Sequence, residues 1–143
     1  MITYAVVGAS LAGLSAANTL RAGDHDGPIV VVDPSPELPS DRPPLSKQVL
    51  AGAWDPEKAH QPLATRVPGL DLDLRLGVAA TGIDVATRTV ALSDGTEVTA
   101  DGIVLAMGAR ARTLPGPPLA GVHVVRDLAD SIALRAELDA GPP

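Results

Sequence analysis

The residues with the clearest chemical potential lie near the N-terminus, in the stretch VVGASLAGLSAA (Val6–Ala17). Gly8, Ser10 and Gly13 have the spacing of a dinucleotide-binding glycine loop, with serine in place of the second glycine. The first glycine of such a loop permits a tight turn, the second a close backbone approach to phosphate, and the third close helix–strand packing. Serine keeps most of that room, and its hydroxyl can donate to a phosphate. The pattern predicts nucleotide binding, with a merely structural turn as the alternative.

The flanking residues predict the elements that must hold this loop. Ile2–Val7 is a short apolar run typical of a buried parallel strand. A helix is expected from Leu11, with Gly23 ending it in the left-handed conformation that glycine readily adopts. Pro28–Asp33 predicts a second strand, so the segment reads as a βαβ unit. Asp33 ends that strand at roughly the ~20-residue separation expected of a ribose-binding acid.

Ser10 also permits a different interpretation, as the serine of a G-x-S-x-G nucleophile elbow. The fifth position of that motif is Ala12 and not glycine, and the motif follows the first strand of the chain. The elbow needs a later acid and histidine, and the spacing selects neither His60 nor His123. The residues therefore disfavour a hydrolase.

Other polar residues suggest no chemistry of their own. The three histidines are scattered without metal-ligand spacing, and no catalytic acid–base pair can be read from the carboxylates. The absence of cysteine excludes disulfides, thiolate metal sites and a cysteine redox relay. We therefore expect no metal site and assign no catalytic residue, so that a cofactor carries any chemistry.

The middle of the chain differs in composition from the βαβ unit that precedes it. PSPELPSDRPPLSK (Pro34–Lys47) is too rich in proline for a helix or a sheet, and a short helix is expected near Ser46–Leu50. Ala53–Leu70 shows no clear period. Strands are expected at Leu72–Leu76 and Val78–Val85.

A hairpin is predicted next, because Asp94-Gly95 between two β-prone runs favours a two-residue type I′ turn. Gly102–Ala109 follows as another apolar strand ending in glycine, and an amphipathic helix is expected over Asp127–Leu138. These elements predict one three-layer α/β unit. Its parallel sheet contains Ile2–Val7, Pro28–Asp33 and Gly102–Met107, with an antiparallel excursion around Asp94-Gly95.

Length and composition limit the remaining possibilities. The 143 residues suit a single domain, and the core must be aliphatic because the chain has no Phe, one Tyr and one Trp. The net charge of −6 without a basic cluster argues against nucleic-acid binding. No export signal or membrane span is apparent, so we expect a cytoplasmic protein that does not bind membranes.

At DRPPLSKQVLAG (Asp41–Gly52) the sequence closely resembles a known family, the FAD-dependent, NAD(P)H-linked ferredoxin, rubredoxin and putidaredoxin reductases. GASLAGLSAA, DGTEVTADGIVLAMGARARTLPG and GVHVVRDLADSIALRAEL resemble that family too, so the similarity spans nearly the whole chain. It implies a Rossmann-like three-layer FAD/NAD(P)-binding fold, which is incomplete relative to the family.

The resemblance also implies roles for individual residues. The glycine loop and its helix would bind the FAD pyrophosphate with Arg42, while Lys47 would lie near the flavin ring. Ala80 matches the position whose backbone meets the adenine, and Arg112 matches an arginine near the pyrophosphate. The complete set of cofactor-binding residues predicted is Gly8, Ser10, Ala12, Gly13, Asp33, Pro34, Arg42, Lys47, Ala80, Ala106, Gly108 and Arg112.

Four positions depart from the family pattern. The ribose acid of the family aligns with Ser35, so either Asp33 substitutes for it or the contact is lost. Ser40 stands where tyrosine is usual, Met107 replaces the threonine of an alanine-threonine-glycine turn, and Ala111 replaces a proline. All four lie on the cofactor side, which predicts weak FAD binding.

Two classes of function follow from the resemblance. In the first, residues 1–143 are the single FAD-binding domain of an oxidoreductase, without the NAD(P)H-binding and C-terminal interface domains and inactive alone. The missing segments would come from a complementary reductase chain or have been lost by truncation. In the second, the chain is a reused remnant, acting as a binding or scaffold protein or in unrelated biosynthetic chemistry. Apolar surface left uncovered predicts a homo-oligomer or a tight partner chain, and the family adds a ferredoxin as a partner.

Overall fold

The computed structural model of the protein describes residues 1–117 and 119–141, which form two compact units. Unit 1 comprises Met1–Pro39 and Leu63–Gly108, and unit 2 comprises Ser40–Pro62 and Ala109–Pro143. All strands found among the described residues belong to unit 1. The units are therefore built differently, and each is described by itself.

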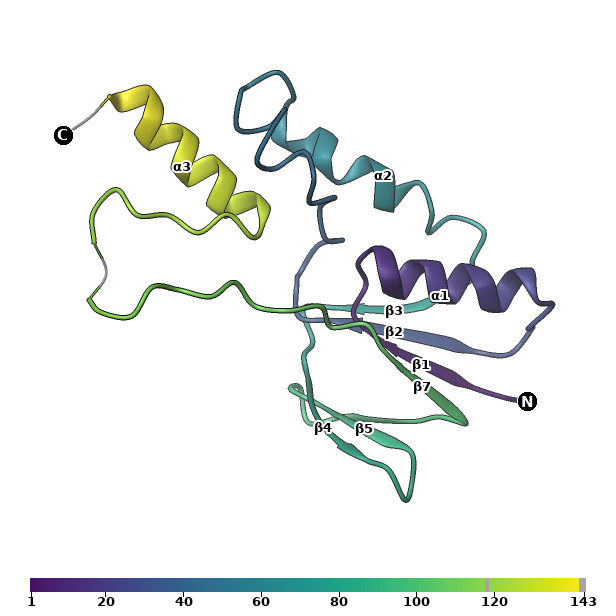
Figure 1. The fold of residues 1–143 in the computed structure, drawn as a ribbon. Coiled ribbons are helices and arrows are strands. Elements are labelled where there is room, and N and C mark those ends of the chain that lie inside the picture. Colours follow the sequence, from purple (N-terminus) through teal and green to yellow (C-terminus); the bar gives the residue numbers. More distant parts are fainter. Residues whose placement is uncertain (118, 142–143) are drawn as a thin grey trace. The chain divides into compact units, whose positions relative to one another are not determined.

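Unit 1 centres on a four-stranded parallel sheet with the order β3-β2-β1-β7 (Figure 1). Its strands are β1 (Tyr4–Val7), β2 (Ile29–Asp33), β3 (Asp73–Leu76) and β7 (Gly102–Leu105). Val6 of β1 aligns with Val31 of β2 and with Val104 of β7. The predicted parallel sheet is confirmed, and β3 extends it beyond β2.

Helix α1 (Leu11–Ala22) covers one face of this sheet, and the second sheet covers the other (Figure 1). Alternate residues of β1 and β2 lie on opposite faces of the parallel sheet. On one face Val6 and Val31 pack with Ala17 of α1. On the other face Ala5 and Val30 pack against the second sheet. Because both faces are buried, the strands read as continuous apolar runs. The three-layer α/β fold predicted from the sequence is confirmed.

The second sheet of unit 1 is antiparallel, with the order β4-β5-β6. It consists of β4 (Ala80–Asp84), β5 (Thr89–Leu92) and β6 (Glu97–Thr99). Val90, Leu92 and Val98 are its buried side chains, and they form the apolar contact with the parallel sheet. This is the predicted excursion.

The predicted type I′ turn at Asp94-Gly95 is wrong, because only Gly95 of this pair has a positive φ, of 83°. The Gly95 amide donates to the Leu92 carbonyl, and the Leu92 amide donates to the Thr96 carbonyl. The turn is therefore centred on Ser93-Asp94 and is followed by a left-handed glycine. Asp94 caps it by accepting hydrogen bonds from the backbone N–H and the hydroxyl of Thr96.

Helix α1 ends at Gly23 as predicted, but not through a left-handed glycine, since the φ of Gly23 is −92°. The left-handed residue is Asp24, with a φ of 62°. The Gly23 amide donates back to the carbonyls of Thr19 and Leu20, which already satisfies the last turn. The left-handed residue that follows α1 is therefore Asp24, one residue later than predicted.

Unit 2 contains the 3₁₀ helix η1 (Pro56–Ala59), the first half of the short α2 (Gln61–Ala64), and α3 (Leu128–Ala140). The prediction of a helix near Asp127–Leu138 is confirmed. Asp127 and Asp130 form a reciprocal capping box at its start, in which each carboxylate accepts from the backbone N–H of the other. This box fixes where α3 begins.

The short helix predicted at Ser46–Leu50 is wrong, because the segment is a series of turns. Its amides donate over irregular spacings: Lys47 and Val49 both donate to the Pro44 carbonyl, and Ala51 donates to Lys47. The Leu45 carbonyl instead accepts from the Ser131 hydroxyl at 2.6 Å. The irregular spacing of these backbone bonds is not that of a regular α-helix.

Candidate nucleotide-binding site

The glycine loop lies where three parallel strands end. The Gly8 amide donates to the Val32 carbonyl at 2.8 Å, and the Ala106 amide donates to the Val7 carbonyl at 2.8 Å. Gly8 has a φ of 110°, and a Cβ added there would lie 2.4 Å from the Ala106 carbonyl oxygen. Only glycine fits this position, both for its conformation and for the space.

Gly13 provides the close helix–strand approach expected of the third glycine. A Cβ at this position would lie 1.8 Å from the Gly8 carbonyl oxygen and 3.2 Å from a methyl group of Val6. The first turn of α1 therefore rests directly on the loop and on β1. Any side chain larger than hydrogen would separate helix from strand.

The start of α1 has the properties of an anion-binding helix terminus. Ser10 is its N-cap residue, and the Ser10 side chain makes no capping hydrogen bond. The first turn carries no acidic residue, Leu11 and Ala12 are exposed, and Leu14 is the first residue to donate back, to the Ser10 carbonyl. The amides before Leu14 have no acceptor within the helix, and the helix dipole adds partial positive charge. Such an end can bind a phosphate.

Asp33 is buried beside the loop and bonded to it. One carboxylate oxygen accepts the Ala9 amide at 2.8 Å, and the other accepts the Ser35 amide at 2.9 Å. Asp33 is only 8% exposed, whereas its neighbour Pro34 is exposed. The sequence predicts Asp33 as a site residue but does not indicate its bond to Ala9, because that bond joins residues 24 positions apart.

The carboxyl end of β2 continues toward β4. The Val78 amide donates to the Asp33 carbonyl, and the Gly77 amide donates to the Ser35 carbonyl. Ala80 then opens β4 as a half-buried residue paired with Leu92. Two backbone bonds thus connect the segment after β2 to the chain that leads into β4.

The turn after β7 supplies the remaining predicted residues of unit 1. Ala106 is half-buried against the glycine loop, whereas Met107 is 64% exposed. Gly108 has a φ of 68°, a conformation that favours glycine. Unit 1 therefore brings Gly8, Gly13, Asp33 and Ala106 together at the carboxyl ends of the parallel strands.

The other predicted residues, Arg42, Lys47 and Arg112, belong to unit 2, and all three are exposed. Arg42 and Lys47 lie in the series of turns, where the Arg42 carbonyl accepts the Leu45 amide at 3.0 Å. Arg112 follows unit 1 in a segment outside any helix or strand.

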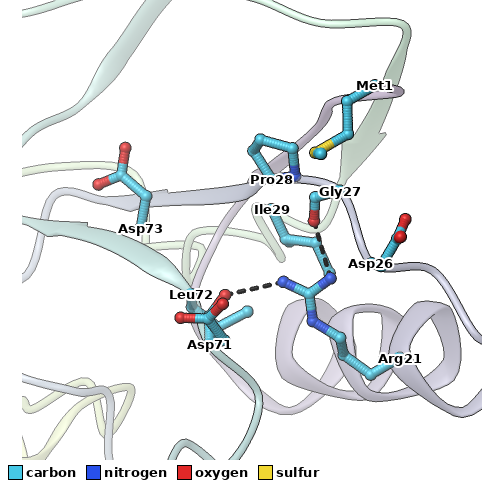
Figure 2. A pocket seen from close by; sticks show the side chains of 9 residues that line it. All are labelled: Met1, Arg21, Asp26, Gly27, Pro28, Ile29, Asp71, Leu72 and Asp73. Atoms are coloured by element: carbon cyan, nitrogen blue, oxygen red, sulfur yellow. Dashed lines mark hydrogen bonds between the residues drawn. The ribbon is translucent and has the colours of Figure 1, made fainter.

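A pocket of about 390 Å³ lies at the other end of the parallel strands, where they begin (Figure 2). The Arg21 guanidinium reaches into it and donates to the carbonyls of His25, Gly27, Leu70 and Asp71 over 2.7–2.8 Å. Its donors are used by the backbone, so Arg21 ties the end of α1 to the starts of β2 and β3. Nothing in the local sequence signals this role.

Within residues 1–117 and 119–141, no group of three or more His, Cys, Asp or Glu residues is arranged to hold a metal ion. None of the helices in the same ranges combines the length and apolar character needed to cross a membrane.

A glycine loop between a parallel strand and a helix, within a βαβ unit, defines the Rossmann-like α/β fold of FAD/NAD(P)-binding proteins. Comparison with known proteins agrees: the model of the family described as pyridine nucleotide-disulphide oxidoreductase matches residues 2–140. The chain belongs to this family.

Named relatives make the comparison more specific. The chain is 41% identical to the ferredoxin--NAD(+) reductase component of the anthranilate 1,2-dioxygenase system of Burkholderia cepacia, over 96% of this chain and 34% of the relative. It is 40% identical to the corresponding component of the biphenyl dioxygenase system of Paraburkholderia xenovorans, over 97% of this chain and 34% of that relative. The chain thus spans about a third of the length of the curated relatives it matches.

Among solved structures, a covalent putidaredoxin reductase–putidaredoxin complex is similar, with a TM-score of 0.84 and 32% identity. The similarity covers 94% of this chain and 34% of the matched chain. The chain therefore resembles a part of ferredoxin reductases in both sequence and fold.

Proposed function

We propose that this chain is the FAD-binding part of a ferredoxin reductase-like oxidoreductase. The observation that carries the proposal is the glycine loop, where the space at Gly8 and Gly13 admits only hydrogen and the exposed start of α1 lacks a side-chain cap. These features fit a pyrophosphate, which needs backbone N–H groups and a close backbone approach. The identity to ferredoxin--NAD(+) reductase components supports the same assignment.

The proposed phosphate and adenosine site lies in unit 1. In unit 1 the phosphate end takes Gly8, Ser10, Ala12, Gly13, Ala106 and Gly108, the adenosine end takes Pro34 and Ala80, and Asp33 is bonded to the backbone of the loop between the two ends. The resemblance to the reductase family adds three residues of unit 2 to the proposed FAD-binding set: Arg42 and Arg112, whose positive charge suits a pyrophosphate, and Lys47. Bound FAD would supply the electron-transfer chemistry, while the chain binds and orients it.

The proposed activity of the whole protein is electron transfer from NAD(P)H to a ferredoxin. The printed sequence contains one dinucleotide-type glycine loop, and hydride transfer needs the nicotinamide held against the flavin in near-attack geometry. We therefore expect residues 1–143 alone to bind FAD at micromolar strength, about −8 kcal/mol, and to oxidise NAD(P)H negligibly. Adding a chain that carries the remaining two thirds of a relative should restore turnover.

The decisive measurement is the absorbance of the purified protein between the near-ultraviolet and the blue, followed by titration with FAD and ADP. A flavin spectrum, or saturable binding that Gly13→Val abolishes, supports the proposal. Equal affinity in wild type and Gly13→Val would show that the site assignment is wrong. Rapid NAD(P)H-dependent flavin bleaching by this chain alone would refute the need for further segments.

The second candidate is a reused binding or scaffold protein without NAD(P)H–flavin turnover. The observation that favours it is the departure from the family pattern at Ser35, Ser40 and Met107, all on the proposed cofactor side. Failure of every complementary chain to restore flavin retention or reduction would support this candidate over the first.

A partner surface is part of the proposal. Leu105 and Met107 are 56% and 64% exposed at β7, which forms one edge of the parallel sheet. Leu114 and Leu138 of unit 2 are also exposed, at 76% and 62%. Apolar surface of this kind fits a second copy or a complementary chain. Sedimentation as a clean monomer at high concentration, with no partner found, would contradict it.

A further inference from the structure

The Asp33 carboxylate is committed to the backbone of the glycine loop. Its two oxygens accept the amides of Ala9 and Ser35 at 2.8 and 2.9 Å, in a residue that is 8% exposed. Ala9 is itself completely buried, between the turn at Gly8 and the N-cap Ser10. The bond from Ala9 therefore fixes the peptide at the centre of the loop.

Hydrogen bonds from backbone amides to an ionised carboxylate are about twice as strong as those between neutral groups. If the acceptor is lost, the buried Ala9 amide is left without a partner, which is costly. The same carboxylate also accepts the amide of Ser35, two residues after Asp33 at the end of β2. Asp33 thus joins β2 to the loop that precedes α1.

A ribose-binding acid must present an oxygen to the ligand. The Asp33 oxygens instead point to two amides of their own unit, and the residue offers little exposed surface. We propose that Asp33 is a positioning residue that holds the glycine loop in its phosphate-binding shape, and that the site takes an adenine nucleotide through its phosphates without a carboxylate bond to the ribose hydroxyls. This inference rests on the proposed function.

The test compares ADP with 2′,3′-dideoxy-ADP by isothermal titration calorimetry. Wild type should bind the two within about threefold, because no charged hydrogen bond to the ribose is lost. Asp33→Asn keeps one acceptor oxygen and loses the other, so it should weaken both nucleotides by the same factor, tenfold or more. If wild type binds the dideoxy nucleotide at least tenfold more weakly and Asp33→Asn weakens ADP alone, Asp33 binds ribose and the inference is overturned.

Asp84→Asn is the matched control. Asp84 also accepts two backbone amides, those of Ala86 and Thr87, but it is exposed and lies at the end of β4. This variant should leave both affinities unchanged.

Hydrogen exchange of the ligand-free protein tests the loop by itself. Asp33→Ala, which removes both acceptor oxygens, should increase exchange at the Ala9 amide and in the first turn of α1, while Val6 and Val31 stay protected. Unchanged protection of Ala9 overturns the inference, whatever the titrations show. If wild type binds neither nucleotide, the proposed function is wrong, and this exchange measurement alone then decides whether Asp33 holds the loop.

If Asp33→Asn does not fold, the wild-type comparison of the two nucleotides still decides. Discrimination of tenfold or more against the dideoxy form contradicts the inference without any variant. Equal binding supports it.

Discussion

The two units hold themselves together by different means. Unit 1 is built on strand ladders: β1 and β2 align through four residue pairs, and β1 and β7 through four more. Unit 2 relies on side chains that bond to backbone, such as Ser131 to the Leu45 carbonyl and Arg135 to the Val49 carbonyl. Its apolar cluster has three fully buried members, Leu45, Val49 and Ala59.

This contrast separates two kinds of vulnerability. A ladder distributes its bonds over many residues, so that a single surface change costs little and a backbone clash costs much. Where single side chains join the elements, as in unit 2, removing one of them loosens the contact that it makes. The proposed nucleotide loop lies in the first kind of structure, whereas Arg42, Lys47 and Arg112 lie in the second.

The largest effect is expected from Gly13→Val. A Cβ 1.8 Å from the Gly8 carbonyl oxygen forces α1 off β1, so unit 1 should lose roughly 4 kcal/mol or more of stability together with nucleotide binding. Thermal unfolding followed by circular dichroism, with an FAD titration alongside, measures both losses.

Gly23→Val is the control for that variant. Gly23 has a negative φ, and a Cβ there would meet its nearest atoms at an ordinary 3.5 Å. A melting temperature as low as that of Gly13→Val would mean that valine in this helix region, and not the clash, is responsible.

Arg21→Met should have the next largest effect within unit 1. The side chain donates to four carbonyls at the start of the sheet, and methionine keeps only its apolar stem. Because the pocket is open to water, we expect a loss of about 2 kcal/mol and not the sum of four bonds. Denaturant unfolding measures it, with Arg66→Met, at an exposed position, as the comparison.

Ser131→Ala tests unit 2. Ser131 is completely buried, and its hydroxyl donates to the Leu45 carbonyl at 2.6 Å. Removing it leaves that carbonyl unsatisfied, at a cost of about 1–2 kcal/mol. Hydrogen exchange should accelerate in the turns after Leu45 and in α3 but not in the parallel sheet.

Ser46→Ala is the matched control, because Ser46 directly follows Leu45 and is exposed. This variant should leave hydrogen exchange unaltered. Equal acceleration across both units in Ser131→Ala would contradict the distinction drawn between them.

The smallest effect concerns acid. The hydrogen bond from the Thr96 hydroxyl, and then that from the Thr96 amide, lower the pKa of Asp94 below its ordinary value of 3.8. A group whose pKa is depressed by folding adds stability above its unfolded-state pKa and loses it as the pH falls through its folded-state pKa. Asp94→Asn should therefore remove a small part of the stability lost below about pH 4. Urea unfolding between about pH 5 and pH 2 checks this, and an unchanged acid limb would count against it.

Much of unit 1 could be predicted from the sequence. Apolar β-branched runs predicted β1, β2 and β7, and the glycine spacing predicted both the loop and the helix that follows it. The turn predicted at Asp94-Gly95 is of another type and lies one residue earlier, on Ser93-Asp94, where the Asp94 side chain accepts from Thr96 and only the following Gly95 has a positive φ. The helix predicted at Ser46–Leu50 is not formed: the amides of this segment donate over irregular spacings, and the Leu45 and Val49 carbonyls accept from side chains of α3, far along the chain.

By itself, the sequence determined which strands form and where glycine is required, since period and glycine spacing are local properties of the chain. It also determined the family, through motifs that extend over nearly its whole length. Only the tertiary structure decided which groups the Asp33 carboxylate holds, how the Arg21 guanidinium is satisfied, and which carbonyl the Ser131 hydroxyl meets. The bonds from Ala9 to Asp33, from Arg21 to Leu70 and from Ser131 to Leu45 join residues 24 or more positions apart, so these partners depend on how the strands and helices pack and cannot be read from neighbouring residues.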